Sequence, residues 1–396
     1  MQDFGEALRS LRTAAGLSQA DLAAATSYAK SHIGNVETGK RQPTTELADA
    51  CDRVLGTSPL LVMLTTNGGS DMRRRALVSI IGTSLGAGFT FGPDTLAEVI
   101  RTALSRDTGD DLEQVVANFE RRYFLEPTTV YGTDLLSELL ILRQRVAERP
   151  DPRTLATTAV LSQLYGLWSG NQGKLTAAHG WYGTAAGLAD RSGDNRVRAD
   201  VRGRSVVRGV YEGWSLSHAR REIETTLALS PTVTVGRLEA HAARVHIAGL
   251  TGAVDEGRQA VADMWRTAEA LPEPDHPATH TARTALFDNF LECRAGTPAS
   301  AERAHTRAVP LLAATPLWLA DAKIYYGRAL VTGGDVAGGV RLGLDAVSSY
   351  SGVNLRVHQV GVRDLLSVVP PGYASDELHA LRAYASPQPG PWETLQ

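Results

Sequence analysis

The segment from residue 28 to residue 41 carries polar side chains in a pattern that could form a binding surface. Ile33 and Val36 are three residues apart, which places them on one face of a helix. The polar side chains of this helix then project from the opposite face, and they are Lys30, Ser31, His32 and Asn35. Two cations, Lys40 and Arg41, follow directly after it. The segment therefore predicts a helix face that donates and accepts hydrogen bonds beside a positive charge.

A second group of candidates lies on one predicted helix between residues 196 and 208. It consists of Arg196, Arg198, Arg202, Arg204 and Arg208. Arg198 and Arg202 are four residues apart and share a helix face. Two interpretations stay open: a solvated helix face, or a groove in which arginine forks hold a carboxylate or a peptide terminus. Asn289 and Tyr325, on later helices, are candidates for the same ligand site.

Three further patterns imitate enzyme or metal sites but lack an essential residue. Residues 34–40 have the glycine and lysine spacing of a phosphate-binding loop, but Arg41 stands where such a loop requires Ser or Thr. His276 and His280 are spaced like metal ligands, yet a proline separates them and no complete ligand set is near, which favours surface histidines. Residues 213–217 lack the last glycine of a nucleophile elbow. We predict no catalytic residue, no metal and no cofactor.

The composition of the whole chain limits the class of protein. With 40 basic and 43 acidic side chains the formal net charge is −3, which excludes a polycation that coats nucleic acid. Two cysteines in 396 residues are too few for a disulfide framework, and no apolar run is long enough to span a membrane. The sequence therefore predicts a cytoplasmic protein with no membrane partner.

Five short helices within residues 4–64 are expected to position the first group of candidates. Apolar residues at positions 4, 8 and 11 give the first helix one apolar face. Ser18 and Asp21 have the spacing of a capping box at the start of the second helix. The third helix runs from about 28 to 37, and residues 43–45 open a fourth, which a fifth follows.

The chain contains the pattern Leu17-Ser18-Gln19-x-x-Leu22-Ala23, followed by Ile33-x-x-Val36-Glu37-x-Gly39-Lys40-x-x-Pro43. This pattern resembles the Xre-type helix-turn-helix family of phage-repressor-like transcriptional regulators, over about 60 of the 396 residues. The resemblance implies that helix 28–37 enters the major groove of operator DNA. It also implies a homodimer that binds half-sites about 34–36 Å apart. Arg12 and Glu37 match a pair that links the first helix to the recognition helix in this family.

Carried over by position, the resemblance assigns DNA contacts to Gln19, Tyr28, Lys30, Ser31, His32, Asn35, Lys40 and Arg41. Gln19 would meet a phosphate, Asn35 can pair with adenine, and Lys30 can donate to guanine. Lys40 and Arg41 would neutralise phosphates. Ala29 stands where the family often has a capping Ser or Thr, so Ser27 is expected to cap the recognition helix instead.

Residues 1–66 contain six basic and seven acidic side chains, a net charge of −1. Because DNA affinity grows with the number of phosphates neutralised, one such domain is a weak DNA binder and two are expected in a dimer. The alternative is a bundle that binds another protein instead of DNA.

Residues 153–385 predict amphipathic helices in pairs. Glycine-containing turns recur at Gly173, Gly213, Gly252, Gly296 and Gly333, a period typical of stacked helical hairpins. Gly166, Ala178 and Ala185 share their spacing with Gly327, Gly339 and Ala346. Small residues at such positions let the two helices of a hairpin approach closely. The pattern resembles a degenerate tetratricopeptide array.

We therefore expect an all-α protein with four parts. These are a helix-turn-helix domain at 1–66, a helical connector at 71–150 that could contribute to dimerisation, a tetratricopeptide-like repeat domain at 153–385, and a tail at 386–396. The expected function is transcriptional regulation by a non-enzymatic, sequence-specific DNA-binding protein whose repeat domain senses a small peptide or metabolite. The alternative is a repeat-based interaction scaffold.

Overall fold

The computed structural model describes residues 2–55, 60–65, 112–125, 129–230, 233–274, 276–349 and 355–386. Within these ranges the regular elements are helices and there is no strand, so the all-α prediction is confirmed. The predictions for the connector up to residue 111 and for the tail from residue 387 fall outside the described residues.

The chain divides into two compact units. One comprises Met1–Leu112 and Thr129–Thr154, and the other comprises Glu113–Thr128 and Leu155–Gln396. The described part of the predicted connector is thus shared between the units.

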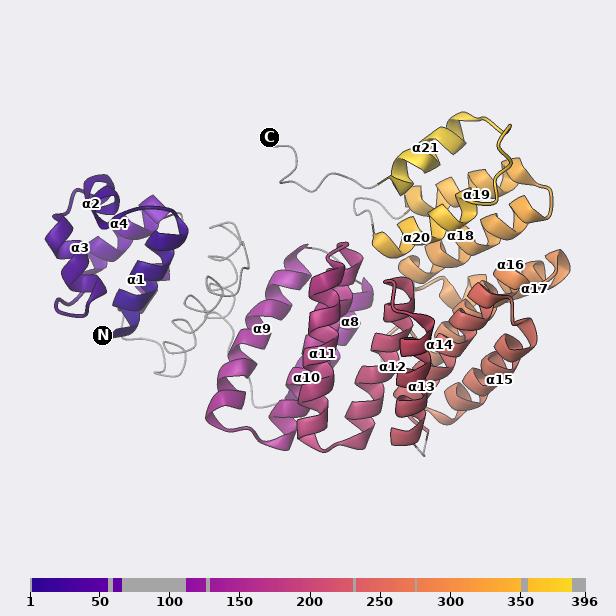
Figure 1. Cartoon of the computed structure of the whole chain (residues 1–396), viewed down its shortest axis with the longest axis horizontal. Coiled ribbons are helices and arrows are strands. Elements are labelled where there is room, and N and C mark those ends of the chain that lie inside the picture. The colour runs from indigo at the N-terminus through magenta and orange to yellow at the C-terminus, as the bar shows by residue number, and fades with distance from the viewer. Residues whose placement is uncertain are drawn as a thin grey trace. The chain divides into compact units, whose positions relative to one another are not determined.

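The first unit begins with five short helices around one apolar core (Figure 1). Its helices are α1 (Gln2–Ala14), α2 (Gln19–Thr26), α3 (Lys30–Glu37), α4 (Thr45–Leu55), α5 (Leu60–Thr65) and, later in the chain, α9 (Thr129–Glu148). The periodic residues Phe4, Leu8 and Leu11 of α1 are all buried in this core, as the sequence predicts, and α3 adds Ile33. Leu140 of α9 packs against the same core.

The ends of α2 follow from local hydrogen bonds. The Asp21 amide donates to the Ser18 hydroxyl at 3.2 Å and the Ser18 amide donates to the Asp21 carboxylate at 2.8 Å, which confirms the capping box. The cap predicted for α3 is wrong. Its N-cap residue is Ala29, without a side-chain hydrogen bond, because Ser27 instead ends α2 in the left-handed conformation with φ 59°. The tight turn into α3 needs a left-handed residue at that point.

The second unit is built from helical hairpins (Figure 1). Its helices are α8 (Leu112–Leu125), α10 (Pro152–Asn171), α11 (Leu175–Ser192), α12 (Asn195–Tyr211), α13 (Leu216–Leu229), α14 (Val235–Thr251), α15 (Val254–Ala270), α16 (His280–Ala295), α17 (Pro298–Leu312), α18 (Pro316–Thr332), α19 (Val336–Ser349), α20 (Arg356–Leu366) and α21 (Asp376–Ala385). Successive helices from α10 onward pair into six hairpins. The first helices of neighbouring hairpins also pack together: α12 on α14, α14 on α16, α16 on α18 and α18 on α20.

Glycines permit the close packing of these helices. A Cβ atom on Gly166 would lie 2.7 Å from Cε1 of Tyr182 on the paired helix, and one on Gly327 would lie 2.7 Å from the carbonyl oxygen of Gly339. The predicted close approach is therefore present in both hairpins. Between α12 and α14, a Cβ atom on Gly203 would lie only 2.5 Å from the carbonyl oxygen of Gly236.

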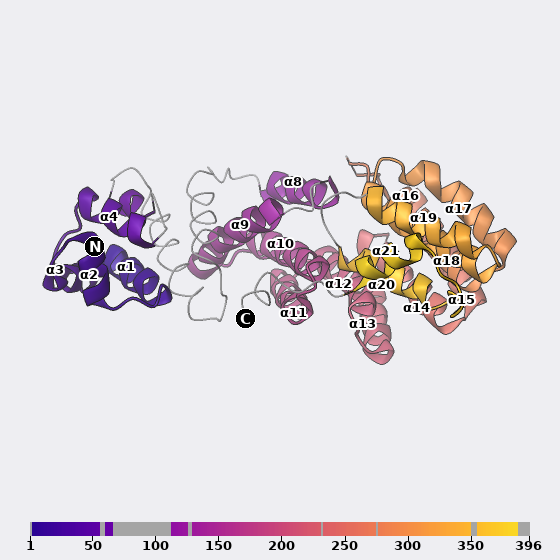
Figure 2. The ribbon, with the colours of Figure 1, turned by 90° about the horizontal axis from the view of Figure 1, so that it is seen from above.

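Helix α8 packs on the face of α10 and α12 that is opposite α11 and α13 (Figure 2). Arg204 of α12 forms an ion pair with Glu120 of α8 at 2.7 Å, and the ring of Phe124 lies 5.2 Å from the ring of Trp318 on α18. The segment Glu113–Thr128, which contains nearly all of α8, is preceded and followed in the chain by residues of the first unit. The chain therefore passes between the two units three times.

Candidate nucleic-acid interface and ligand cavity

Helix α3 separates its apolar and polar residues as the sequence predicts. Ile33 and Val36 are 0% and 1% exposed. Lys30, Ser31 and Asn35 are exposed on the other side of the helix. This face offers an ammonium, a hydroxyl and an amide group to a partner.

The turn after α3 brings two cations beside this face. The backbone amides of Lys40 and Arg41 both donate to the carbonyl oxygen of Asn35, at 2.8 and 3.1 Å. Both side chains are exposed. Asn35, which is predicted to contact a base, thus lies next to Lys40 and Arg41, which are predicted to contact phosphates.

Tyr28 and His32 are half-buried neighbours at the start of α3. Their ring centroids are 5.1 Å apart and the rings meet edge to face. Burial, together with the nearby charge of Arg41, lowers the pKa of His32. His32 is therefore neutral at pH 7 and can take part in hydrogen bonds without adding charge.

Gln19 is tied to the domain's own core. Its side-chain amide donates to the Glu37 carboxylate at 2.7 Å, and its side-chain oxygen lies against Gly34 of α3. Gln19 is half-buried. Its contact with a DNA phosphate stays a prediction.

The predicted pair of Arg12 and Glu37 is confirmed. Arg12 donates from Nε to one Glu37 oxygen at 2.6 Å and from Nη2 to the other at 3.1 Å. The Glu37 side chain is 0% exposed and that of Arg12 is 12% exposed. Arg9, which sequence reasoning did not single out, donates to the Glu37 carbonyl oxygen at 3.2 Å. These bonds fix the end of α3 against α1.

The charge on the surface of this domain differs from the net value of −1. Glu37 is the acidic residue within 30–41, and it is buried and neutralised by Arg12. Asp52 is also buried, and its carboxylate accepts hydrogen bonds from the amides of Leu61 and Val62 at the start of α5. The recognition face therefore presents its cations without an exposed carboxylate in the same segment.

Residues 3–62 match the family described as a helix-turn-helix domain.

The helix-turn-helix domain suggests DNA binding and is typical of non-enzymatic regulators, and an all-helical region follows it. The match ends at residue 62, so the tetratricopeptide-like character of the hairpins stays a prediction. A search of curated proteins and a search of solved structures found no match to this chain.

Among the described residues, no group of three or more His, Cys, Asp or Glu side chains could hold a metal ion, and no helix is long and apolar enough to cross a bilayer. His276 is half-buried, with its ring stacked on Phe124 at 5.3 Å.

The predicted ligand residues of the second unit do not come together in one site. Arg198 and Arg202 both bind the carboxylate of Asp190, at 2.8 and 2.7 Å. The buried amide of Asn289 donates to the carbonyl oxygen of Ala322 at 3.1 Å. Tyr325 lines a cavity to which the other three do not contribute.

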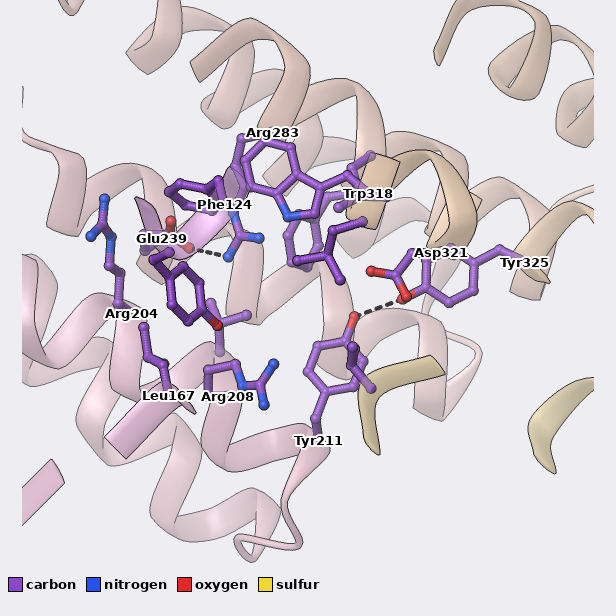
Figure 3. A pocket seen from close by; sticks show the side chains of 16 residues that line it. Phe124, Leu167, Arg204, Arg208, Tyr211, Glu239, Arg283, Trp318, Asp321 and Tyr325 are labelled. Atoms are coloured by element: carbon purple, nitrogen blue, oxygen red, sulfur yellow. Dashed lines mark hydrogen bonds and ion pairs between the residues drawn. The ribbon is translucent and has the colours of Figure 1, made fainter. Parts of the chain in front are cut away.

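This cavity has a volume of about 70 Å³ and lies on the side of the unit where α8 packs (Figure 3). Its wall comes from α8 and from the first helices of all six hairpins, α10 to α20. Sequence reasoning did not single out Arg283, Trp318 and Asp321, which line it. The signal that could have found Asp321 is its place as a lone acid in the mostly apolar helix 316–332.

Proposed function

We propose that this protein is a sequence-specific transcriptional regulator that binds operator DNA as a homodimer through an Xre-type helix-turn-helix domain, and that its tetratricopeptide-like hairpins bind a small ligand or peptide. The observation that carries the proposal is the exposed polar face of α3, held by the buried Arg12–Glu37 pair in a domain that matches a helix-turn-helix family.

The number of exposed cations on the recognition segment supports the proposed homodimer. The recognition segment presents three exposed cations, Lys30, Lys40 and Arg41. If each neutralises one phosphate, a single domain gives a slope of log K against log salt of roughly −3, and two domains give roughly −5. The slope reports the number of phosphates neutralised, and a homodimer that neutralises twice as many binds DNA more tightly than a single domain does.

The test starts with the purified full-length chain and a pool of randomised DNA duplexes. Sequences that the protein retains are identified, and its affinity for them is measured at several salt concentrations. A slope near −5 and enrichment of a two-fold symmetric site are expected. A protein that enriches no sequence and shows no salt dependence would instead be the interaction scaffold that the domain's net charge of −1 also allows.

Two variants then separate the roles within the interface. Asn35→Ala should lose about 1–3 kcal/mol of preference at one base pair, whereas Arg41→Ala should weaken binding to all duplexes and reduce the salt slope by about one. Arg53→Ala is the matched control, because Arg53 is an exposed arginine on α4 that pairs with Asp49 outside the recognition face. Equal, sequence-independent losses from Asn35→Ala and Arg41→Ala would remove Asn35 from the base-reading role.

The path of the chain supports the ligand-binding part of the proposal. Tyr123 and Phe124 of α8 line the cavity, and the segment Glu113–Thr128 that contains them is preceded and followed in the chain by residues of the unit that contains the helix-turn-helix domain. A ligand that changes how α8 packs would therefore act on a segment joined at both ends to that unit. A coupling of about 1–3 kcal/mol between ligand and DNA would change DNA affinity about 5- to 150-fold.

A further inference from the structure

Asp321 is a buried carboxylate that points into the cavity without a hydrogen-bond partner (Figure 3). Its side chain is 7% exposed, and it accepts no hydrogen bond from the described residues. Nε2 of His358 lies 3.6 Å from Asp321 and 3.2 Å from the carbonyl oxygen of Leu317. Burial lowers the pKa of His358 to about 4, so this imidazole is neutral at pH 7 and does not balance the carboxylate.

The three arginines of the cavity wall are already paired with carboxylates. The pairs are Arg204 with Glu120 at 2.7 Å, Arg208 with Glu212 at 3.0 Å, and Arg283 with Glu239 at 2.6 Å. An anionic ligand would have to compete with these internal carboxylates. Asp321, in contrast, has no lysine or arginine of the described residues within ion-pairing distance, and its neighbour His358 is neutral. Burial raises the pKa of Asp321 to about 7, so the group is partly protonated at pH 7, and a cation that enters the cavity would favour its ionised form.

Aromatic rings surround the same part of the cavity. Tyr211 and Tyr325 join their hydroxyl groups at 3.1 Å, and Figure 3 shows both rings beside Asp321. The indole of Trp318 also lines the cavity, and no hydrogen bond from its N–H group is formed with the described residues. The faces of such rings attract cations, most strongly where water is excluded. A carboxylate flanked by tyrosine and tryptophan is a setting that suits an ammonium group.

We propose that this cavity binds a small organic cation whose ammonium group pairs with Asp321 and packs against Tyr211, Tyr325 and Trp318. Since one water needs about 10–15 Å³ of such space, 70 Å³ admits a group of roughly five non-hydrogen atoms. The proposal that the cavity binds this cation does not depend on the proposed function. Only the statement that the bound cation regulates DNA binding rests on the proposed function.

The first experiment compares three small molecules of similar size and different charge on the full-length protein. The probes are n-butylammonium chloride, 1-butanol and sodium butyrate, followed by saturation-transfer NMR at constant ionic strength. We expect butylammonium to bind with a dissociation constant of about 0.1–10 mM, and the neutral and anionic probes to bind at least about tenfold more weakly. No binding of butylammonium, equal binding of all three probes, or preferential binding of butyrate would overturn the proposal.

The second experiment tests the carboxylate. Asp321→Asn keeps the shape of the side chain and removes its charge, so the affinity for butylammonium should fall about 10- to 100-fold. Asp255→Asn is the control, because the Asp255 side chain is fully exposed and lies outside the cavity, and it should leave the affinity unchanged. A loss of less than about twofold in a folded Asp321→Asn protein would overturn the assignment of Asp321. Should that variant fail to fold, the comparison of the three probes on the unmodified protein still decides.

A third measurement distinguishes this inference from the proposed function. Binding of a selected DNA duplex is measured with and without saturating butylammonium, and with sodium chloride of equal concentration. Butylammonium that binds at the cavity and leaves DNA affinity unchanged would support the site and contradict its regulatory role. A protein that binds DNA and no ammonium would contradict the site and leave the DNA-binding proposal standing.

Discussion

Replacing Glu37 by alanine should destabilise the helix-turn-helix domain while leaving the hairpins intact. The Glu37 side chain is fully buried and receives hydrogen bonds from Arg12 at 2.6 and 3.1 Å and from Gln19 at 2.7 Å. Its removal strands the Arg12 guanidinium, which is only 12% exposed. Breaking a buried pair in this way typically costs about 3–5 kcal/mol, and a domain of this size has only about 3–9 kcal/mol of stability in total.

Cysteine labelling measures this loss of stability of the helix-turn-helix domain within the full-length protein. Cys51 is fully buried in the core of the helix-turn-helix domain, and burial raises the pKa of its thiol to about 12, so iodoacetamide reacts with it only after the domain opens. Cys293, buried on α16, reports on the second unit in the same sample. Mass spectrometry of the two peptides then gives both rates. A cost of about 3–5 kcal/mol should speed the labelling of Cys51 by about two to three and a half orders of magnitude and leave Cys293 unchanged.

Asp49→Ala is the control for this experiment. Asp49 forms an ion pair with Arg53 at 3.0 Å on the surface of α4, where both side chains are at least half exposed. Loss of such a surface pair should change the labelling rate of Cys51 less than about threefold. If Glu37→Ala changes that rate no more than Asp49→Ala does, the Arg12–Glu37 pair does not hold the domain together and the reasoning is refuted.

Three further predictions concern packing, backbone conformation and pH. Gly203→Ala would place a methyl group 2.5 Å from the Gly236 carbonyl oxygen, so tryptophan fluorescence should report a loss of about 1–3 kcal/mol in the stability of the second unit. Ser27→Gly should slow the labelling of Cys51 about two- to fivefold, because glycine tolerates φ 59° without strain. Burial raises the pKa of Asp321 from 3.8 to about 7, so the folded state binds its proton more tightly than the unfolded state, and the contribution of Asp321 to stability should fall as pH rises from about 4 to about 7. The groups that face Asp321 are Arg208, Arg283, His358, Tyr211, Tyr325 and Tyr384.

Each of these three predictions has its own control or contradicting outcome. Gly187→Ala in α11 fills open space and should not destabilise, so an equal loss from both glycine variants would rule out the steric argument. Faster labelling of Cys51 in Ser27→Gly would show that the left-handed serine is not strained. Other buried groups, such as Asp200 and His246, give both proteins the same further pH dependence, so the test is the difference between them. The thermal midpoint of Asp321→Asn relative to that of the unmodified protein should increase as pH rises from about 4 to about 7, and a constant difference would exclude Asp321 as a source of the pH dependence.

Features of the first unit could be predicted because short-range patterns set them. The apolar face of α1 and the capping box of Ser18 and Asp21 occur at fixed short spacings. The pairing of Arg12 with Glu37 is implied by the resemblance to the Xre-type family. The cap of α3 could not be predicted in this way. Whether Ser27 ends one helix or begins the next depends on its backbone conformation, and residue type alone does not determine it.

The cavity could not be predicted because its wall is assembled from segments far apart in the chain. The spacing of Arg198 and Arg202 indicates a shared helix face, but not that Asp190 of the preceding helix lies between their guanidinium groups. In the same way, the sequence shows Asp321 as an acid in an apolar helix. It does not show that the nearby Arg208 and Arg283 pair with Glu212 and Glu239 and not with Asp321. Charge pairing between distant helices decides both outcomes.

The position of α8 in the chain also has a consequence for biosynthesis. The ribosome completes the five helices of the helix-turn-helix domain first, and α8 follows with Phe119 and Tyr123, which are 1% and 6% exposed in the folded protein. Trp318, on which Phe124 packs, is made about 190 residues later, which takes about 10–40 s at common rates of synthesis. During that interval these aromatic side chains have no native partner on α18. We therefore expect nascent chains that stall between α9 and α18 to carry a folded DNA-binding domain beside an uncovered apolar helix, which is a form that chaperones bind and that aggregates when they are absent.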